Sequence, residues 1–339
     1  MTITSEERDA PTVDAIRQCI HDVYRIDGVM SRLPGENLNY LVEAKDDRKY
    51  VAKIAGDELP PILVSLQHQA IKHATGKGTE ASGVLEFPII LENRRREPET
   101  RIELPLYGRK RLRLLSFIEG VNLSDLSDIS KELAFELGFK LGSYSRMMAD
   151  FVHPAADRHH RWNLAHADQH IHKVGWVENA EQRGLLAWAF AQWTGNASME
   201  LAQLDWQFIH GDFNPENIRV RNGRIVGLLD FDDACWNPAI CELAICLAYQ
   251  MMDHEDPWPV AAAVIDGYRT QRPITPAEEA VLLPLVQGRL AVSISVATER
   301  RRIDPTNANW FVSEKPAWKL LAQIEASGHR QFPSAVHGM

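Results

Sequence analysis

The chain has 339 residues, of which 45% are hydrophobic and 24% are charged; this excludes a disordered, collagen-like or disulfide-scaffold protein and predicts about two domains. Its 46 acidic and 37 basic side chains give a net charge of -9. That balance argues against a nucleic-acid binder, because phosphate backbones attract Lys and Arg, but it is compatible with one bound nucleotide.

The first third of the chain is predicted to be rich in strands. Two β-rich runs, 40–44 and 50–54, flank a polar turn and predict a hairpin. Apolar residues four apart then predict a helix over 61–74. Further strands are expected at 85–90 and 112–118, and the charged stretch between them is interpreted as a solvated turn.

Beyond Glu119-Gly120 the pattern becomes helical. Ser130 is placed to cap a helix that extends to Met148. Further elements are expected in this order: a helix over 181–203, a hairpin over 217–230, and helices over 239–252 and 277–300. We therefore predict a β-rich lobe over 1–115, a hinge over 116–120 and a helical lobe over 121–339.

Neither a disulfide framework nor a membrane segment is expected. The four cysteines (Cys19, Cys235, Cys241 and Cys246) form no Cys-x-x-Cys pair, and the last three fall in a stretch interpreted as buried helix. The N-terminal residues contain no apolar signal core, and no run approaches the roughly 18 consecutive apolar residues of a membrane helix. The sequence therefore predicts a cytoplasmic protein that does not bind membranes.

The hairpin over 217–230 has a register that can be predicted from its turn. Asn222-Gly223 is the preferred centre of a two-residue type I′ turn, which pairs 221 with 224, 220 with 225 and 217 with 228. Strand residues two apart point the same way, so Asn217 and Asp230 are expected on one face, with Cα atoms on the order of 7–8 Å apart. The side chains of Ile218, Val220, Ile225 and Leu229 are expected to face the core.

The polar face of this hairpin indicates a site for a hard cation. A carboxylate and an amide oxygen, with no His or Cys ligand, suit Mg²⁺, which proteins hold through one or two carboxylates plus substrate phosphates. Asp212 lies just before the hairpin, where a carboxylate can accept a proton from an attacking hydroxyl. His210 is interpreted as a residue that braces the loop.

These residues form the pattern His-x-Asp-x-x-x-x-Asn (210–217) followed by Asp230-Phe231, which is typical of protein-kinase-like enzymes. Gly211 stands where kinases have Arg, and Asp232 stands where they have Gly. The chain resembles the aminoglycoside phosphotransferase-like kinases, closest to their hydroxylysine kinase-type branch. Stretches 31–42 and 289–305 carry the softer resemblance to that branch.

The resemblance implies a two-lobed, protein-kinase-like α+β fold, with a small β-rich N-lobe that binds nucleotide and a larger helical C-lobe. Asp212 would be the catalytic base, and Asn217 and Asp230 would hold Mg²⁺. Lys53, in Val-Ala-Lys, would contact the α- and β-phosphates of ATP or GTP.

Further nucleotide contacts are implied in the N-lobe. The loop with Gly35, Asn37 and Asn39 would cover the phosphates, and the hinge, including Ser116 and Ile118, would offer backbone groups to adenine. Kinases usually pair the strand lysine with a helical glutamate, but residues 61–75 contain no acid, and Gln67 is the nearest candidate partner.

Three residues are candidates for the acceptor side. Asp232 follows the metal residue and is a candidate to line the substrate site. Trp162, within 161–164, resembles a tryptophan motif of the branch, although a packed aromatic is the simpler interpretation. Arg301 lies in a basic helix end, which is usually solvated, and its guanidinium is also suited to a substrate carboxylate.

The predicted reaction is phosphoryl transfer from ATP or GTP to a hydroxyl of a small, cationic molecule, such as hydroxylysine or a related amino-alcohol. The chain passes from Asp230 through Trp236-Asn237-Pro238 into a helix, which leaves little room for a peptide-binding loop. Alternatives are a homoserine, choline or aminoglycoside kinase, a nucleotide-binding pseudokinase, and a metal-dependent hydrolase that uses His210 and Asp212. Both a monomer and a homodimer are compatible with the sequence.

Overall fold

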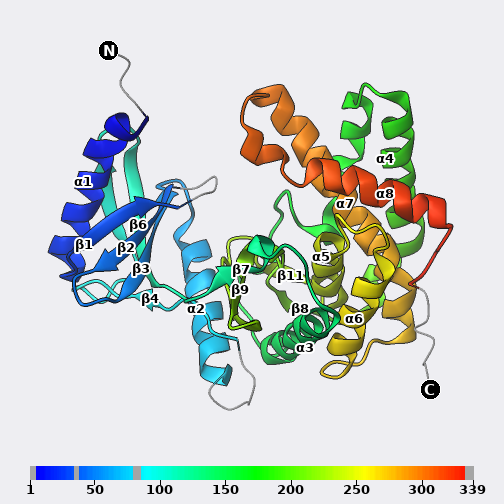
Figure 1. Ribbon diagram of the computed structural model, residues 1–339, viewed down its shortest axis with the longest axis horizontal. Coiled ribbons are helices and arrows are strands. Elements are labelled where there is room, and N and C mark those ends of the chain that lie inside the picture. Colours follow the sequence, from blue (N-terminus) through cyan, green and yellow to red (C-terminus); the bar gives the residue numbers. More distant parts are fainter. Residues whose placement is uncertain (1–4, 34–37, 79–84, 333–339) are drawn as a thin grey trace. The chain divides into compact units, whose positions relative to one another are not determined.

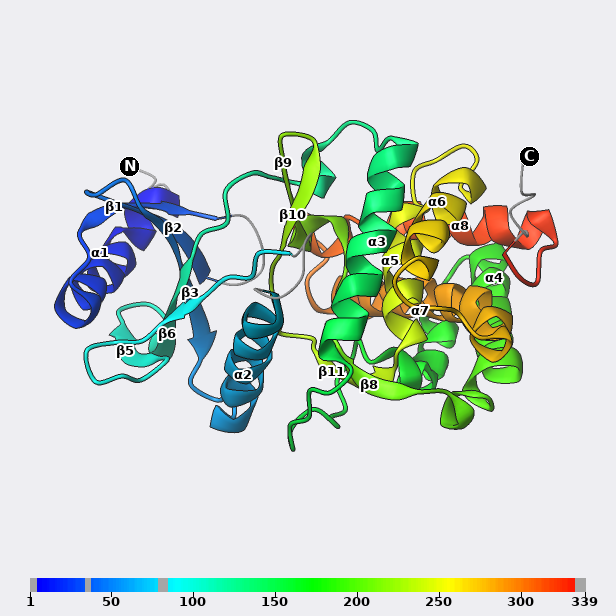
Figure 2. The same ribbon diagram turned by 90° about the horizontal axis from the view of Figure 1, so that it is seen from below.

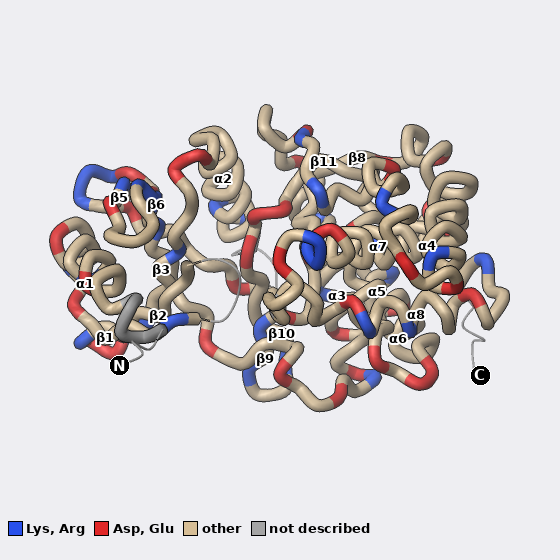
Figure 3. Tube along the Cα trace, turned by 90° about the horizontal axis from the view of Figure 1, so that it is seen from above, with Lys and Arg blue, Asp and Glu red and all other residues tan. Residues whose placement is uncertain are grey.

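The computed structural model describes residues 5–33, 38–78 and 85–332, and the chain divides into two compact units (Figure 1). Unit 1 comprises residues 1–72 and 87–119, and unit 2 comprises residues 73–86 and 120–339. Lys and Arg residues are interspersed with Asp and Glu residues along the traces of both units (Figure 3).

Unit 1 is built on an antiparallel sheet with the order β1-β2-β3-β6-β4, in which β5 also pairs with β6. Its elements are α1 (Ser5–Tyr24), β1 (Gly28–Arg32), β2 (Leu38–Ala44), β3 (Lys49–Gly56), α2 (Pro61–Gly78, whose last turns belong to unit 2), β4 (Ile90–Leu91), β5 (Thr100–Leu104) and β6 (Gly108–Ser116). Ile16 and Ile20 of α1 pack into one core with buried residues of β2, β3, β5 and β6, including Tyr40 and Leu114.

The sequence predicted much of unit 1, but helix α1 and strand β1 were not predicted, and two later segments differ from the prediction. The hairpin at 40–54, the helix predicted over 61–74 and the strand predicted over 112–118 are confirmed, although α2 extends to Gly78 and β6 spans Gly108–Ser116. The strand expected over 85–90 is almost absent, since only β4 begins there at Ile90. The charged stretch interpreted as a turn ends in strand β5, because Ile102 and Leu104 alternate with exposed residues and are buried.

Unit 2 is mostly helical, with two small sheets. Its elements are β7 (Val121–Asn122), α3 (Lys131–Met148), α4 (Ala180–Gln192), β8 (Trp206–Ile209), β9 (Ile218–Arg221), β10 (Arg224–Leu228), β11 (Cys235–Pro238), α5 (Ile240–Gln250), α6 (Trp258–Arg269), α7 (Pro276–Ile303) and α8 (Glu314–Ser327), with a 3-10 segment over Leu164–Trp176. Ser130 caps α3 as predicted, since its side chain accepts a hydrogen bond from the Leu133 N–H. The helix expected over 181–203 is shorter, because a π-helical turn follows α4.

The cysteines are buried or half-buried and free. Cys241 and Cys246 lie in α5 as expected, but Cys235 lies in strand β11 and not in a helix. This strand completes the sheet with β8 and was not predicted.

Helices α3 and α6 lie side by side (Figures 1 and 2) and approach closely through glycines. A Cβ atom added at Gly138 of α3 would lie 1.8 Å from the Val264 carbonyl oxygen, and one added at Gly267 of α6 would lie 1.9 Å from the Phe135 carbonyl oxygen. The two backbones therefore leave no room for any side chain at these crossing points.

We expect Gly138→Ala to lower the free energy of unfolding by about 3 kcal/mol, because α3 and α6 must separate to admit the methyl group. The matched control is Gly184→Ala in α4, where an added Cβ meets no atom within 4 Å. That change should stabilise by about 0.5–1 kcal/mol through the lower entropy of the unfolded chain. Urea denaturation of both variants measures the difference, and equal stabilities would contradict this packing.

Among the described residues, one helix, α7, has the length and apolar composition needed to cross a membrane. Its most apolar 18-residue window is 94% buried within the protein, and buried core helices pass the same test. Helix α7 is thus packed as a core helix of unit 2, and the cytoplasmic location stays a prediction.

Candidate active site

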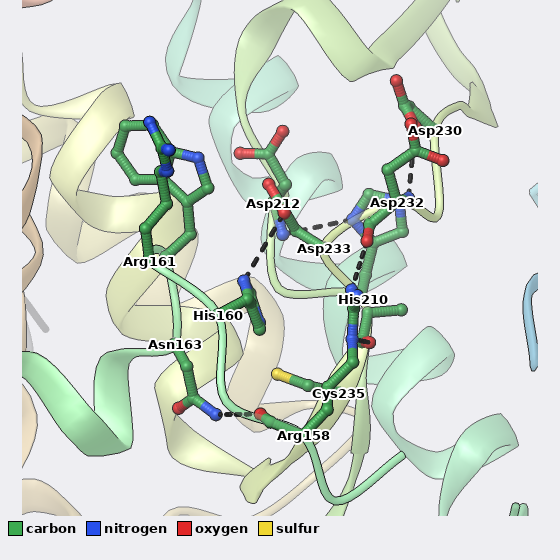
Figure 4. Close-up of polar contacts among 12 residues, drawn as sticks. Arg158, His160, Arg161, Asn163, His210, Asp212, Asp230, Asp232, Asp233 and Cys235 are labelled. Atoms are coloured by element: carbon green, nitrogen blue, oxygen red, sulfur yellow. Dashed lines mark hydrogen bonds and ion pairs between the residues drawn. The ribbon is translucent and has the colours of Figure 1, made fainter. Parts of the chain in front are cut away.

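The predicted catalytic and metal-binding residues lie in two loops of unit 2 that join the same end of the β8–β11 strand pair. Strand β8 pairs with β11 antiparallel, with Ile209 opposite Cys235. Residues 210–217 follow β8, and residues 229–234 precede β11, so the pairing brings both segments together. Figure 4 shows Asp212, Asp230, Asp232 and Asp233 gathered around these loops.

The hairpin between the loops forms with the predicted turn but with a shifted register. Asn222 and Gly223 both have positive φ, as a type I′ turn requires, and the pairs 221–224 and 220–225 are confirmed. A bulge follows Ile225, so that Leu228 pairs with Ile218 and not with residue 217. Leu228 is therefore fully buried, whereas Leu229, which was expected to face the core, is only half-buried.

The bulge has a partner that lies far away in the sequence. The Glu86 N–H donates to the Val226 carbonyl (2.7 Å), and the Leu228 N–H donates to the Glu86 carbonyl (3.1 Å). These bonds satisfy the β10 groups that the bulge turns out of the hairpin. Asn217 nevertheless stays next to the segment that leads to Asp230, because its carbonyl accepts a hydrogen bond from the Leu229 N–H at 2.8 Å.

His210 braces the loop 210–217, which carries the predicted catalytic residue Asp212. It is fully buried; its Nδ1 accepts from the Asp212 N–H (3.3 Å), so its Nε2 carries the proton that is donated to the Leu229 carbonyl (2.8 Å). Burial lowers the pKa of His210, which favours this neutral form. Gly211 has φ +78, and a Cβ there would lie 2.5 Å from the Asp233 carbonyl oxygen, which explains why Arg does not occupy this position.

A buried carboxylate holds the start of the loop. Glu242 of α5 is 1% exposed; its two oxygens accept from the backbone N–H groups of His210 and of Gly211, the latter at 3.1 Å. Burial raises the pKa of Glu242 to about 8, although these two hydrogen bonds act in the opposite direction. The sequence analysis did not identify this residue.

We expect Glu242 to make the protein less stable as pH rises from about 4.5 to about 8. Between these values the folded state binds the Glu242 proton and the unfolded state does not, so the free energy of unfolding falls, by roughly 3–5 kcal/mol. Glu242→Gln should remove this slope, whereas the exposed Glu181→Gln should keep it. Urea denaturation at several pH values tests this, and parallel curves for wild type and Glu242→Gln would contradict it.

Asp212 is held by donors on both carboxylate oxygens. The Asn217 Nδ2 donates to Oδ2 at 2.8 Å, and the Arg289 Nη2 donates to Oδ1 at 3.3 Å. The Asp212 side chain is 22% exposed, so it stays accessible from solvent. The arrangement suits a general base, because its orientation is fixed while each oxygen keeps a further lone pair.

Asn217 and Asp230 are suited to a magnesium ion. Because the Asn217 amide nitrogen faces Asp212, its oxygen Oδ1 faces away from that residue, as a metal ligand must. Asp230 has φ +58, which turns its carboxylate out of the strand path, and its Oδ1 accepts from the Asp232 N–H (3.1 Å). Within the described ranges, no three His, Cys, Asp or Glu side chains come together as a metal site. Oxygen donors from Asn, Asp and phosphate fit Mg²⁺ rather than zinc.

Asp233 adds a further acidic group that the sequence analysis did not assign to the site. Its Oδ1 lies 3.5 Å from the Nδ1 of His160 (Figure 4). Burial and the nearby Asp212 carboxylate raise the pKa of Asp233, whereas burial lowers the pKa of His160 to about 3. His160 is therefore neutral and adds no positive charge beside Asp233.

Unit 1 holds the predicted nucleotide residues that the structure describes. Lys53 of β3 is 9% exposed, and its Cα neighbours across the sheet are Asn39 and Arg113. The buried Asn39 Oδ1 has no hydrogen-bond partner within the described part of the chain. Gln67, the candidate partner of Lys53, accepts a hydrogen bond from Arg113.

The structure describes only some of the remaining residues that were predicted to contact the nucleotide. Gly35 and Asn37 lie outside the described residues. In the hinge, the N–H groups of Ser116 and Phe117 already donate to the carbonyls of Ile89 (2.8 Å) and Lys49 (3.2 Å). Ile118 is 5% exposed.

The candidate acceptor residues Trp162 and Arg301 both have protein partners. The Trp162 ring lies under the guanidinium groups of Arg289 (4.9 Å) and Arg300 (5.9 Å). Arg301 pairs with Glu314 and stacks on Phe311 at 4.3 Å, which ties the end of α7 to the start of α8. These contacts account for both side chains without a substrate.

The sequence profile described as "Phosphotransferase enzyme family" matches residues 30–281. The chain belongs to the phosphotransferase enzyme family. This match spans both units and includes residues 210–217 and 229–234, which carry the predicted site residues. The predicted enzyme class is thus confirmed at the level of the phosphotransferase family.

Curated relatives of the phosphotransferase chain include small-molecule kinases. Hydroxylysine kinase from Bos taurus is 25% identical over 236 residues, which cover 65% of this chain and 62% of the bovine protein. Homoserine kinase from Gluconobacter oxydans (strain 621H) is 39% identical over 160 residues, 47% of each chain. The match therefore spans less than two thirds of the hydroxylysine kinase.

Solved structures confirm the kinase-like fold of this phosphotransferase. An amicoumacin kinase in complex with AMP-PNP and Ca²⁺ has a TM-score of 0.68 at 14% identity, covering 97% of this chain and 98% of that one. A microcompartment-associated aminopropanol kinase has a TM-score of 0.69 at 15% identity, covering 95% of this chain and all of that one (100%). The predicted two-lobed α+β fold is confirmed.

Proposed function

We propose that this chain transfers the γ-phosphoryl group of ATP or GTP to a hydroxyl of a small, cationic molecule, such as hydroxylysine or a related amino-alcohol. The observation that carries the proposal is the arrangement of the catalytic loop. Asp212 is held between the Asn217 and Arg289 donors, and the Asn217 carbonyl is bonded to the residue before Asp230. A structural turn needs no such convergence of polar groups.

Asp212 would accept the proton of the acceptor hydroxyl. The hydroxyl oxygen then forms a bond to the γ-phosphorus while the bond from that phosphorus to the bridging oxygen breaks, and the nucleoside diphosphate leaves. His210 and Glu242 keep the loop in place during this exchange. Catalysis would come from positioning and charge neutralisation.

Magnesium would be held by Asn217 and Asp230. When bound, the ion neutralises charge on the phosphate oxygens. Ca²⁺ accompanies AMP-PNP in the related amicoumacin kinase, which supports a divalent metal with a nucleoside triphosphate. Asp212 points its Oδ2 at Asn217, so the base and the metal residue share one hydrogen-bonded frame.

Nucleotide binding is assigned to the lobe over 1–115 and the hinge over 116–120, and the acceptor to residues 121–339. Lys53 would contact the phosphates, and the unpartnered Asn39 Oδ1 beside it in the sheet offers an acceptor for a nucleotide group. Ser116 and Ile118 would border adenine.

A cationic acceptor is favoured by the acidic groups of unit 2. Asp232 and Asp233 follow Asp230, and the His160 ring beside Asp233 is neutral. The aminopropanol kinase and the hydroxylysine kinases are named for amino-alcohol or hydroxylated amine acceptors. Homoserine is a second candidate, because the homoserine kinase match has the higher identity, 39%.

An acceptor screen tests the proposal. Protein, Mg²⁺ and ATP or GTP are incubated with hydroxylysine, 1-amino-2-propanol, homoserine, choline and an aminoglycoside, and mass spectrometry detects the phosphorylated product. We expect one amine-bearing acceptor to gain a phosphoryl group. Nucleotide binding without transfer to any acceptor would favour a pseudokinase, and bound zinc with hydrolytic activity would favour the hydrolase.

A further inference from the structure

Helix α7 carries a charge in a place where a charge is costly. Residues 281–297 of α7 are buried without interruption, and Arg289 is the one charged residue among them. The Arg289 side chain is 1% exposed. A guanidinium at such a depth destabilises the fold unless specific groups compensate it, so its partners indicate why it is there.

Those partners fix the guanidinium in one orientation. Its Nη2 lies 3.0 Å from the Tyr249 hydroxyl and 3.3 Å from Asp212 Oδ1, and its Nη1 donates to the Trp162 carbonyl at 3.1 Å. The rings of Trp162 and Tyr249 lie 4.9 and 5.4 Å from its central carbon. Because these contacts come from three separate segments, Arg289 is held as a rigid planar fork.

The fork in turn fixes Asp212. Asn217 contacts one carboxylate oxygen and Arg289 contacts the other, so rotation of the carboxylate about its last bond would break one of the two contacts. A base must meet the hydroxyl proton within hydrogen-bond reach and in line. Arg289 is too deeply buried to bind the acceptor itself, and its effect must pass through Asp212.

We propose that Arg289 is a positioning residue, which holds the Asp212 carboxylate in the orientation that accepts the acceptor proton. The inference rests on the proposed function. Tyr249 helps to hold Arg289 in this orientation, since its hydroxyl accepts a hydrogen bond from Arg289 Nη2, the same nitrogen that contacts Asp212.

Kinetics of Arg289→Met, Arg289→Lys and Tyr249→Phe test the proposal, with the acceptor that the screen identifies. Arg289→Met should lower kcat about 100-fold and change the KM values of nucleotide and acceptor by less than about threefold. Arg289→Lys keeps a cation and should recover part of the loss, and Tyr249→Phe should lose about threefold to tenfold in kcat. A rise in acceptor KM at unchanged kcat would show a binding role and overturn the proposal.

The matched control is Arg272→Met, which removes another largely buried arginine of unit 2, paired with Glu278 at 2.6 Å. It should lower stability yet leave kcat within about twofold. If Arg272→Met lowers kcat as much as Arg289→Met does, the effect of Arg289 is merely structural. In the Asp212→Asn background, Arg289→Met should lower the residual rate no further, and an additional loss would overturn the proposal.

Measurements of unfolding free energy test this inference independently of the proposed function. The stability losses of Arg289→Met and Asp212→Asn should not add in the double variant, because the two residues share one contact. Additive losses overturn the inference whether or not the protein turns over. A wild type that phosphorylates no acceptor overturns the proposed function, and Arg289 would then be a structural partner of Asp212 only.

Discussion

Asp212→Asn should lower kcat for acceptor phosphorylation by about 10³-fold while the nucleotide affinity stays within about threefold. The asparagine side chain fits the same space and keeps an oxygen for the Asn217 amide, but it cannot accept the hydroxyl proton. The change also leaves the buried Arg289 with less compensating charge, because Asp212 is its 3.3 Å ion-pair partner. We therefore expect a loss of about 1–3 kcal/mol in unfolding free energy.

Product formation measured at saturating nucleotide and acceptor gives the rate, and nucleotide titration gives the affinity. Asp168→Asn is the control, because Asp168 is an exposed aspartate of the same unit. Its kcat should equal that of wild type. Full activity of Asp212→Asn would show that Asp212 is not the catalytic base.

The second large effect is expected at Asp230. Asp230→Asn should raise the Mg²⁺ concentration for half-maximal activity more than tenfold and lower kcat about 10²-fold, because a neutral amide binds a hard cation less well than a carboxylate. Asparagine tolerates the left-handed backbone at this position, φ +58. The loss should therefore come from metal binding and not from strain.

Asp253→Asn is a matched control, since Asp253 is exposed and has the similar φ of +65. It should keep the wild-type magnesium dependence. Removing divalent ions with a chelator should abolish wild-type turnover, and added Mg²⁺ should restore it. An unchanged magnesium requirement in Asp230→Asn would show that the ion binds elsewhere.

The parts of the site that sequence could predict are those fixed by local geometry. His210, Asp212 and Asn217 lie within one loop, and the Asn222-Gly223 turn sets the hairpin that follows. The bulge was missed because its cause, pairing with Glu86, depends on a contact between distant parts of the chain.

The supporting residues were missed for a related reason. Arg289 and Glu242 contact the catalytic loop across 77 residues and about 30 residues of sequence, respectively. Each carried a signal nonetheless, because each is an ionisable residue inside an otherwise apolar helical run. Such a residue requires a buried partner, and in this protein both partners belong to the catalytic loop.

In the fold, too, some elements were predicted from the sequence and others were missed. The helix α1 was not predicted, although Ile16 and Ile20 are spaced as on a buried helix face. Strand β5 was hidden by its charged neighbours, although its apolar residues alternate with period two. The apolar spacing of both elements could have been recognised in the sequence. It was missed because each surrounding stretch was interpreted by its overall composition.

The most direct test of the account is the position of the metal. Crystals of the full chain with AMP-PNP and Mn²⁺ would locate the ion by its anomalous scattering. We predict an ion at about 2.1–2.2 Å from the Asn217 Oδ1 and from an Asp230 carboxylate oxygen, with phosphate oxygens completing its shell. An ion bound away from both residues, with nucleotide present, would contradict the assignment of this loop and hairpin as the phosphoryl-transfer site.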